Sequence, residues 1–380
     1  MIIFLYFILL LLIVYVYAGY PLLVLLGATV RSQPVRKRAF EPTVTIIIPA
    51  YNEEQHIGKT IANKLALDYP HDKVEILVVS DGSTDHTDSI VRQYESQRVR
   101  LLRQEPRAGK TLGLNAAIRE ARGEIAFFSD ANSLHHPDAL KKLVANFADP
   151  QVGYVTGKML YTNPDGSVIG DGCSAYMKYE NTLRLWETRL GSIVGVDGGV
   201  DAVRRTLYIP MNADQLPDFV LPLSVIDQGY RVVYEPEALL YEDALNTAED
   251  EYRMRVRVSL RALWALWDMR HLFLPGTNLL YSWQLWSHKI VRYLSFVFLL
   301  GAFLSNLVLL GSGKVYAVIF AGQCMFYLCA LLSPLLEKSG KRFRSLYWAY
   351  YFSIINIAAG HAFLKFLSGK KIVVWNPRKG

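Results

Sequence analysis

The sequence predicts an α/β domain with a mostly parallel sheet, preceded by a transmembrane helix and followed by transmembrane or interfacial helices. Between positions 44 and 130, short apolar strands alternate with helical segments, which is typical of α/β domains. The 380 residues are 52% hydrophobic and only 20% charged, and the apolar residues gather in long runs near both ends. We therefore divide the chain into a transmembrane helix, the α/β domain, interfacial amphipathic helices and a transmembrane region, with bounds 1–30, 42–250, 251–284 and 285–380.

Residues 1–27 form one apolar run without a charge, which is long enough to span a bilayer. Because no basic residue precedes the run, it is interpreted as an uncleaved anchor rather than a signal peptide. Four basic residues follow it directly: Arg31, Arg36, Lys37 and Arg38. By the positive-inside rule, we expect an integral membrane protein whose α/β domain is cytoplasmic. Membrane topology thus explains the net charge of +7, and no nucleic-acid recognition motif supports a nucleic-acid partner.

Acidic residues follow three of the predicted strands. The first strand, from Val44 to Pro49, runs into a loop that contains Glu53, and the second ends at Asp81. A third strand covers 99–102, Lys110 begins a helix, and a fourth strand, 125–128, is followed by Asp130 and Asn132. Because the carboxyl ends of parallel strands meet at one edge, we expect these groups to form a nucleotide site there. Each residue alone is equally consistent with a turn or a helix cap.

Two common nucleotide-binding motifs are absent. The first strand is not followed by G-x-G-x-x-G, and the chain lacks G-x-x-x-x-G-K-[ST], so neither a dinucleotide site nor a P-loop is expected. A nucleoside diphosphate with a divalent metal fits the remaining pattern. The three cysteines, Cys173, Cys324 and Cys329, have no spacing typical of a metal site or a disulfide framework.

Four segments of the α/β domain carry a more specific signal: Val44–Glu54, Asp81-Gly-Ser83, Gly109-Lys110 with Asn115, and Ser129-Asp-Ala-Asn132. In this order they resemble family-2 glycosyltransferases with the GT-A fold, a Rossmann-like nucleotide-sugar-binding domain. The likeness covers about residues 42–262, and membrane-embedded members of this family make hyaluronan, cellulose, chitin and poly-N-acetylglucosamine.

The resemblance implies a site for a nucleotide sugar, with a UDP-sugar as the expected donor. Its base and ribose would be held by Ala50, Tyr51, Glu53 and Asp81. Lys110 would lie near the diphosphate, and Asp130 would contact the ribose and, with Asn132, a Mg²⁺ or Mn²⁺ ion. Asn132 departs from the family, which usually has a second Asp there. An amide oxygen can still bind these cations, although it brings no charge.

The second half of the domain would provide the acceptor side. The apolar residues of 176–190 have helical spacing, and the following Gly191–Arg205 matches a family segment that lies against the acceptor sugar. Asp197, Gly198 and Gly199 are the expected acceptor-binding residues. The alternative is a plain turn before a strand.

Asp218 is the expected general base, because an acceptor hydroxyl must lose a proton as it attacks the anomeric carbon. It matches the last acid of the family's acidic element, although Pro217 replaces the acid before it. Asp214 is the alternative. Downstream, Arg257 and Arg261 are the expected contacts to the leaving diphosphate, in a segment that lacks the family's Q-x-x-R-W element. The same arginine helix is also consistent with a position in the membrane interface.

Three further apolar runs cover about 293–310, 315–336 and 346–367. If all three crossed the membrane, the C-terminus would lie outside, yet four cationic residues there favour the cytoplasm: Lys370, Lys371, Arg378 and Lys379. We therefore expect one late segment to be re-entrant or interfacial, with the region 356–361 as the candidate.

The sequence thus predicts a membrane-bound, metal-dependent, inverting hexosyltransferase that extends an extracellular or capsular polysaccharide, with accessory export proteins as compatible partners. Transfer of one sugar to a lipid-linked acceptor or glycolipid is the alternative within this class. A catalytically inactive membrane scaffold is the alternative outside it. A transporter is disfavoured, because no charged residue lies deep within an apolar run.

Overall fold

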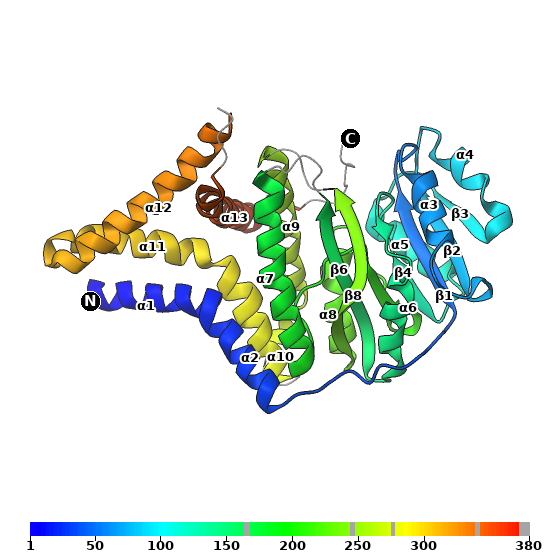
Figure 1. Ribbon diagram of the computed structural model, residues 1–380, viewed down its shortest axis with the longest axis horizontal. Helices are drawn as coiled ribbons and strands as arrows, with labels where there is room; N and C mark the ends of the chain where they lie inside the picture. Colours follow the sequence, from blue (N-terminus) through cyan, green and yellow to red (C-terminus); the bar gives the residue numbers. More distant parts are fainter. Residues whose placement is uncertain (163–167, 244–247, 275–277, 339–342, 372–380) are drawn as a thin grey trace.

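A computed structural model describes residues 1–162, 168–243, 248–274, 278–338 and 343–371 (Figure 1). Its centre is an eight-stranded sheet in the order β3-β2-β1-β4-β7-β6-β8-β5. The strands are β1 Val44–Ala50, β2 Val74–Asp81, β3 Val99–Gln104, β4 Ile125–Phe128, β5 Leu134–His135, β6 Val152–Thr162, β7 Asp201–Arg204 and β8 Arg231–Asp243.

The two halves of the sheet differ in strand direction. The first four strands in sheet order are all parallel and come from residues 44–128, which confirms the predicted α/β pattern. In the second half, β7 is antiparallel to both β4 and β6, whereas β6 and β8 are parallel. The sheet is therefore mixed. The strands flanking β1 are β2 on one side and β4 on the other, and at such a switch in strand order ligands bind beyond the carboxyl ends.

Helices cover both faces of the sheet. One face is covered by α3 Ile57–Leu65, α4 Thr87–Arg92 and α6 Ala139–Val144, whose side chains Ile61, Val91 and Leu143 are fully buried. The other face is covered by α5 Lys110–Glu120, α8 Pro217–Asp227, α9 Ala248–Asp268 and α10 Leu279–Leu285. α5 and α8 carry Lys110 and Asp218, so this second face supports the candidate site.

A long helix, α7 Val168–Leu190, connects the sheet domain to the apolar helices. It packs on α2 Tyr20–Val30, where Gly27 lies so close to Leu190 that a Cβ atom at Gly27 would be 3.1 Å from its Cδ1. α1 Ile2–Val14 precedes α2 and lies beside α11 Ser295–Val308 (Figure 1). The remaining long helices are α12 Lys314–Lys338 and α13 Arg344–Leu367.

Three helical stretches of the described residues are long and apolar enough to cross a membrane: Ile2–Val30, Ser295–Ser312 and Lys314–Leu336. α13 is not among them. It packs instead on α9, where Ala358 and Ala362 contact Val256, Leu260 and Leu263.

The end of the described chain returns to the sheet domain. The indole Nε1 of Trp264, on α9, donates to the carbonyl oxygen of Lys370 at 2.8 Å. The ammonium group of Lys371 forms an ion pair with Asp214 and lies 4.7 Å from the Trp264 ring centroid. The C-terminal segment thus lies against the loop before α8.

Candidate active site

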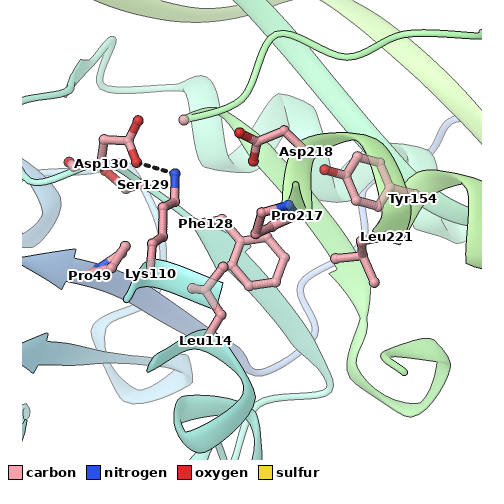
Figure 2. A pocket seen from close by; sticks show the side chains of 11 residues that line it. Pro49, Lys110, Leu114, Phe128, Ser129, Asp130, Tyr154, Pro217, Asp218 and Leu221 are labelled. Carbon is pink, nitrogen blue, oxygen red and sulfur yellow. Dashed lines mark hydrogen bonds and ion pairs between the residues drawn. The ribbon is translucent and has the colours of Figure 1, made fainter. Parts of the chain in front are cut away.

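A small pocket opens at the carboxyl ends of β1 and β4, at the switch in strand order (Figure 2). Its floor is apolar and is formed by Pro49, Leu114, Phe128, Pro217 and Leu221. Three charged side chains face it: Lys110 from the start of α5, Asp130 just after β4, and Asp218 from the first turn of α8. Residues that are far apart in the sequence therefore place two carboxyl groups and one ammonium group around one cavity.

Lys110 and Asp130 form an ion pair, with 2.6 Å between Nζ and Oδ1. Burial would lower the pKa of Lys110, but Asp130 and then Asp218 hold it above its usual value. The lysine therefore stays charged at neutral pH. Figure 2 shows its side chain directed toward Asp130, with the carboxyl group of Asp218 facing the same space from another side.

Asp81 holds the loop that leads to Lys110. Its carboxylate accepts hydrogen bonds from the backbone amide of Ala108 at 2.8 Å, that of Gly109 at 3.0 Å, and Gln104 Nε2 at 2.6 Å. Because Gly109 immediately precedes α5, these bonds fix the N-terminus of the helix that presents Lys110. In the structure, the Asp81 side chain thus forms hydrogen bonds with protein groups beside the expected site of the nucleobase.

The other expected donor-binding residues surround the same edge. Ala50 ends β1, and the guanidinium of Arg107 stacks on the ring of Tyr51 at 3.5 Å from its centroid. Glu53 is anchored through its backbone amide, which donates to Thr87 Oγ1 at 2.8 Å. Burial, reinforced by Asp130 and Asp85, raises the pKa of Glu53 to about 7. Glu53 therefore changes charge within the physiological range.

The loop of Asp130 and Asn132 is fixed from behind by α3. Thr60 Oγ1 donates to the carbonyl oxygen of Ala131 at 2.6 Å, and the buried Lys64 Nζ donates to that of Ser133 at 2.6 Å. Burial lowers the pKa of Lys64 to about 7, while Asp130 opposes the shift. These two bonds hold the loop against α3.

The donor set at this loop suits a metal that is shared with a substrate. Among the described residues, no group of three or more His, Cys, Asp or Glu side chains could hold a metal alone. Asp130 provides one carboxylate and Asn132 one amide oxygen. Mg²⁺ is commonly bound by one or two protein oxygens together with substrate phosphates and water, and the residues fit that arrangement.

The expected acceptor segment lies between the two acids. Gly198 and Gly199 both have positive φ, +80° and +72°. A Cβ atom at Gly198 would lie 3.0 Å from Asp218 Oδ2, and one at Gly199 would lie 3.7 Å from Asp130 Oδ2. The positive φ favours glycine at both positions, and at Gly198 a side chain would also fill the space in front of the Asp218 carboxylate.

Asp197 points away from this space into a buried ion pair. Its carboxylate lies 2.6 Å from Arg184 Nη1, and the two side chains are only 5% and 6% exposed. Arg184 also donates from Nε to the carbonyl oxygen of Gly195 at 3.0 Å. In the structure, Asp197 therefore fixes the segment Gly195–Gly199, the glycine segment, to α7.

Of the two expected arginines, Arg261 reaches the site. Its Nη2 donates to the carbonyl oxygen of Gln215 and lies 3.5 Å from Thr111 Oγ1 on α5. Burial lowers the pKa of Arg261, Asp218 opposes that shift, and Arg257 adds to it. Arg257 lies one helical turn earlier on α9 and is half-buried.

Sequence reasoning missed two buried residues beside the pocket, Asp201 and Tyr154. Asp201 begins β7 and Tyr154 lies on β6, where it lines the pocket. Nothing in the sequence pattern indicated them, because their position depends on the pairing of β7 with β4 and β6.

Part of the chain is similar to known proteins. Residues 45–208 match the family model described as "Glycosyl transferase family 2". The chain is 28% identical over 231 residues to the "Probable glycosyltransferase YdaM" of Bacillus subtilis, covering 57% of this chain and 54% of that protein. It is 26% identical over 221 residues to the poly-beta-1,6-N-acetyl-D-glucosamine synthase of Staphylococcus aureus, covering 56% and 53%. The matches thus span about half the length of these curated relatives.

Among solved structures, the fold is similar to that of the mannosyltransferase PcManGT from Pyrobaculum calidifontis in complex with GDP-Man and Mn²⁺. The TM-score is 0.74 at 23% identity, and the likeness covers 96% of this chain and 99% of that one. This agreement extends the shared fold beyond the sheet domain to the apolar helices.

Proposed function

We propose that the chain acts as a family-2 glycosyltransferase that transfers a hexose from a nucleotide-sugar donor to a membrane-associated acceptor with inversion at the anomeric carbon. The observation that carries the proposal is the arrangement of Lys110, Asp130 and Asp218 around one pocket. A cation beside the expected diphosphate position and a carboxylate facing it provide the two groups that such a displacement requires.

In the proposed reaction, Asp218 accepts the proton of the acceptor hydroxyl. The acceptor oxygen forms a bond to the anomeric carbon, while the bond from that carbon to the diphosphate oxygen breaks. A single displacement of this kind inverts the configuration, so an α-linked donor gives a β-linked product. Lys110 and Arg261 stabilise the negative charge that develops on the leaving diphosphate.

We propose that Asp130 and Asn132 hold a divalent cation, Mg²⁺ or Mn²⁺, together with the donor diphosphate. When bound, the cation would neutralise charge on the departing diphosphate. Tyr51, Glu53 and Asp81 would contact the base and ribose of the donor. Arg107 and the loop of Ala108 and Gly109 surround the same space, so donor binding is expected to change their contacts with Tyr51 and Asp81.

The expected donor is a UDP-sugar, as the resemblance of the sequence motifs implies. GDP-mannose is the second candidate donor, because it is bound by the mannosyltransferase whose fold matches nearly the whole chain. The likeness to the synthase favours a growing polysaccharide as the acceptor. Transfer of one sugar to a lipid-linked acceptor or glycolipid stays the alternative.

We propose that the sheet domain is cytoplasmic and that Ile2–Val30, Ser295–Ser312 and Lys314–Leu336 cross the membrane. The last two spans would form a pair, so the chain after them returns to the cytoplasmic side. The contacts of Lys370 and Lys371 with Trp264 and Asp214 support this topology, because they hold the C-terminal segment against the sheet domain. α13 would then lie in the interface on α9, which resolves the charge conflict noted in the sequence.

The test is nucleotide release by the purified protein in detergent with Mn²⁺, a panel of UDP-sugars and GDP-mannose, and an acceptor extract. Release with one donor only, lost in Asp218→Asn, is the expected result. Binding of nucleotide without release under all conditions, in protein shown to be folded, would support the inactive scaffold instead. Product length on gels would distinguish polymerisation from transfer of a single sugar.

A further inference from the structure

One buried acid beside the pocket has no part in the mechanism above. Asp201 is 1% exposed, and neither of its carboxyl oxygens makes a hydrogen bond of acceptable geometry. An isolated carboxylate in such a place is strongly destabilising, so buried acids are normally paired or neutral. A buried acid without a pair therefore requires an explanation.

The strand register places Asp201 under the reacting groups. It is paired with Phe128 of β4 and with Thr156 of β6, so these three side chains share one face of the sheet. That face is the one covered by α5 and α8, which carry Lys110 and Asp218. Tyr154 of β6 pairs with Val203, which follows Asp201 by two residues on β7 and lies on the same face. Tyr154 is thus a diagonal neighbour of Asp201 and also lines the pocket.

The charged and titratable groups around Asp201 disfavour a negative charge on its carboxyl group. Asp218 from α8 and Asp197 from the glycine segment are both acidic and raise the pKa of Asp201, whereas the Thr156 hydroxyl and Lys110 from α5 oppose the shift. From β6, the hydroxyls of Thr156 and Tyr154 lie beside the carboxyl group, and β4 contributes Phe128. Burial, followed by Asp218, raises the pKa of Asp201 well above its usual value.

Tyr154 connects this acid with the pocket. Burial, Asp201 and Asp218 all raise the pKa of its phenol, so the hydroxyl remains a neutral donor. Figure 2 shows the hydroxyl on the side of the ring toward Asp218. A hydroxyl can accept one hydrogen bond and donate another, and this allows it to stand between an acid that donates and a carboxylate that accepts.

We propose that Asp201 is a protonated positioning residue for the base, donating a hydrogen bond to Tyr154, which in turn donates to Asp218. The inference rests on the proposed function, because it assigns Asp218 as the base. A chain of this kind orients the Asp218 carboxylate toward the acceptor and keeps it ionised, since hydrogen bonds to a carboxylate favour its charged form.

The first measurement is independent of activity. Infrared spectra of wild type and Asp201→Asn are compared at a pH one unit above the value of about 7 for Glu53, where Glu53 is largely ionised. The expected result is a carbonyl band of a neutral carboxylic acid in wild type that is lost in the variant. Its absence from wild type would overturn the proposal.

The second measurement is the pH profile of kcat/KM, whose acidic limb reports the base. Asp201→Val and Tyr154→Phe each remove a donor, so we expect the limb to move to higher pH and kcat to fall on the order of tenfold. Asp201→Asn keeps a neutral donor, so its limb is expected to stay near that of wild type and its kcat well above that of Asp201→Val.

Other outcomes would contradict the proposal. If Asp201 were ionised, Asp201→Asn would remove a negative charge near Asp218, and the limb would move to lower pH. If the acidic limb of Tyr154→Phe matched that of wild type, the connection through the tyrosine would be excluded. Tyr154→Phe keeps the ring, so it still tests the proposal if Asp201→Val does not fold. Thr156→Val, beside Asp201 but outside the pocket lining, is the control and is expected to leave the limb in place. Wild-type protein that releases no nucleotide would refute the proposed function, and the infrared band would then decide the protonation of Asp201 alone.

Discussion

The ammonium group of Lys110 lies 2.6 Å from Asp130 Oδ1 at the edge of the pocket that Asp218 faces. The pair holds a cation at the expected position of the donor diphosphate. Lys110→Met is expected to lower kcat/KM for the donor by about 10²-fold, the effect of removing one group that stabilises developing charge. Steady-state nucleotide release measures it. Lys110→Arg keeps the charge and is expected to retain more activity; equal losses in both variants would argue against a charge effect.

The base assignment can be tested against its neighbour in sequence. Asp218→Asn is expected to lower kcat by about 10²- to 10⁴-fold, with nucleotide affinity measured by calorimetry nearly unchanged, because the variant loses only proton transfer. Asp214 is the matched control, since its carboxylate is paired with Lys371 away from the pocket. Asp214→Asn is expected to remain within a few-fold of wild type. The reverse order of losses would move the base to Asp214.

Gly198 tests the space in front of the base. Gly198→Ala would place a Cβ atom 3.0 Å from Asp218 Oδ2 at a φ of +80°, so we expect both a lower melting temperature and a large loss of kcat. Gly229 is a control for backbone strain, because its φ is +83° and no atom lies within 4 Å of a Cβ there. Gly229→Ala is expected to reduce stability to a similar degree without loss of kcat in the folded fraction.

Asp197 is expected to act in stability as part of the pair with Arg184. Asp197→Asn leaves a buried guanidinium without its carboxylate, which is expected to lower the free energy of unfolding by about 3 kcal/mol. Asp227, whose exposed side chain contacts His271 at 3.0 Å, is the control, and Asp227→Asn is expected to cost about 0.5 kcal/mol or less. Thermal unfolding in detergent compares them. A stable Asp197→Asn variant with a raised acceptor KM would instead support direct acceptor binding.

Glu53 gives a dependence of stability on pH. Its pKa rises from 4.5 to about 7 on folding, so the native state binds more protons than the unfolded state between these values. The stabilisation is complete below about 4.5 and is lost as pH rises through about 7. Glu53→Gln lacks this dependence, so its melting temperature relative to wild type is expected to increase over that interval. Glu95→Gln, at an exposed position, controls for the loss of a carboxylate, and parallel curves for all three proteins would contradict the prediction.

The first half of the sheet could be predicted because its information is local. Apolar β-branched runs such as Val44–Ala50 indicate strands covered on both faces, and the acids at their tips follow from the chain direction alone. The sequence predicts that Lys110 and Asp130 lie at one edge of the sheet, and the structure brings them into contact.

The second half depends on long-range pairing that no local pattern contains. The antiparallel insertion of β7 between β4 and β6 decides that Asp201 lies under the pocket, whereas its sequence neighbour Asp197 faces α7. The position of α13 could not be predicted either, because its apolar run is compatible both with a membrane span and with the observed packing on α9.

The order of the strands also places the residues expected to recognise the two substrates in consecutive parts of the sequence. The residues expected to hold the base, ribose and metal of the donor lie within 44–132, and those expected to face the acceptor lie after 152, with the boundary in the short connection before β6. Recombination at that connection would exchange one recognition surface as a contiguous block and leave the other intact. A chimera that keeps the β4–β7 pairing is therefore expected to inherit its nucleotide preference from one parent and its product from the other, a route by which such enzymes can diversify in single steps.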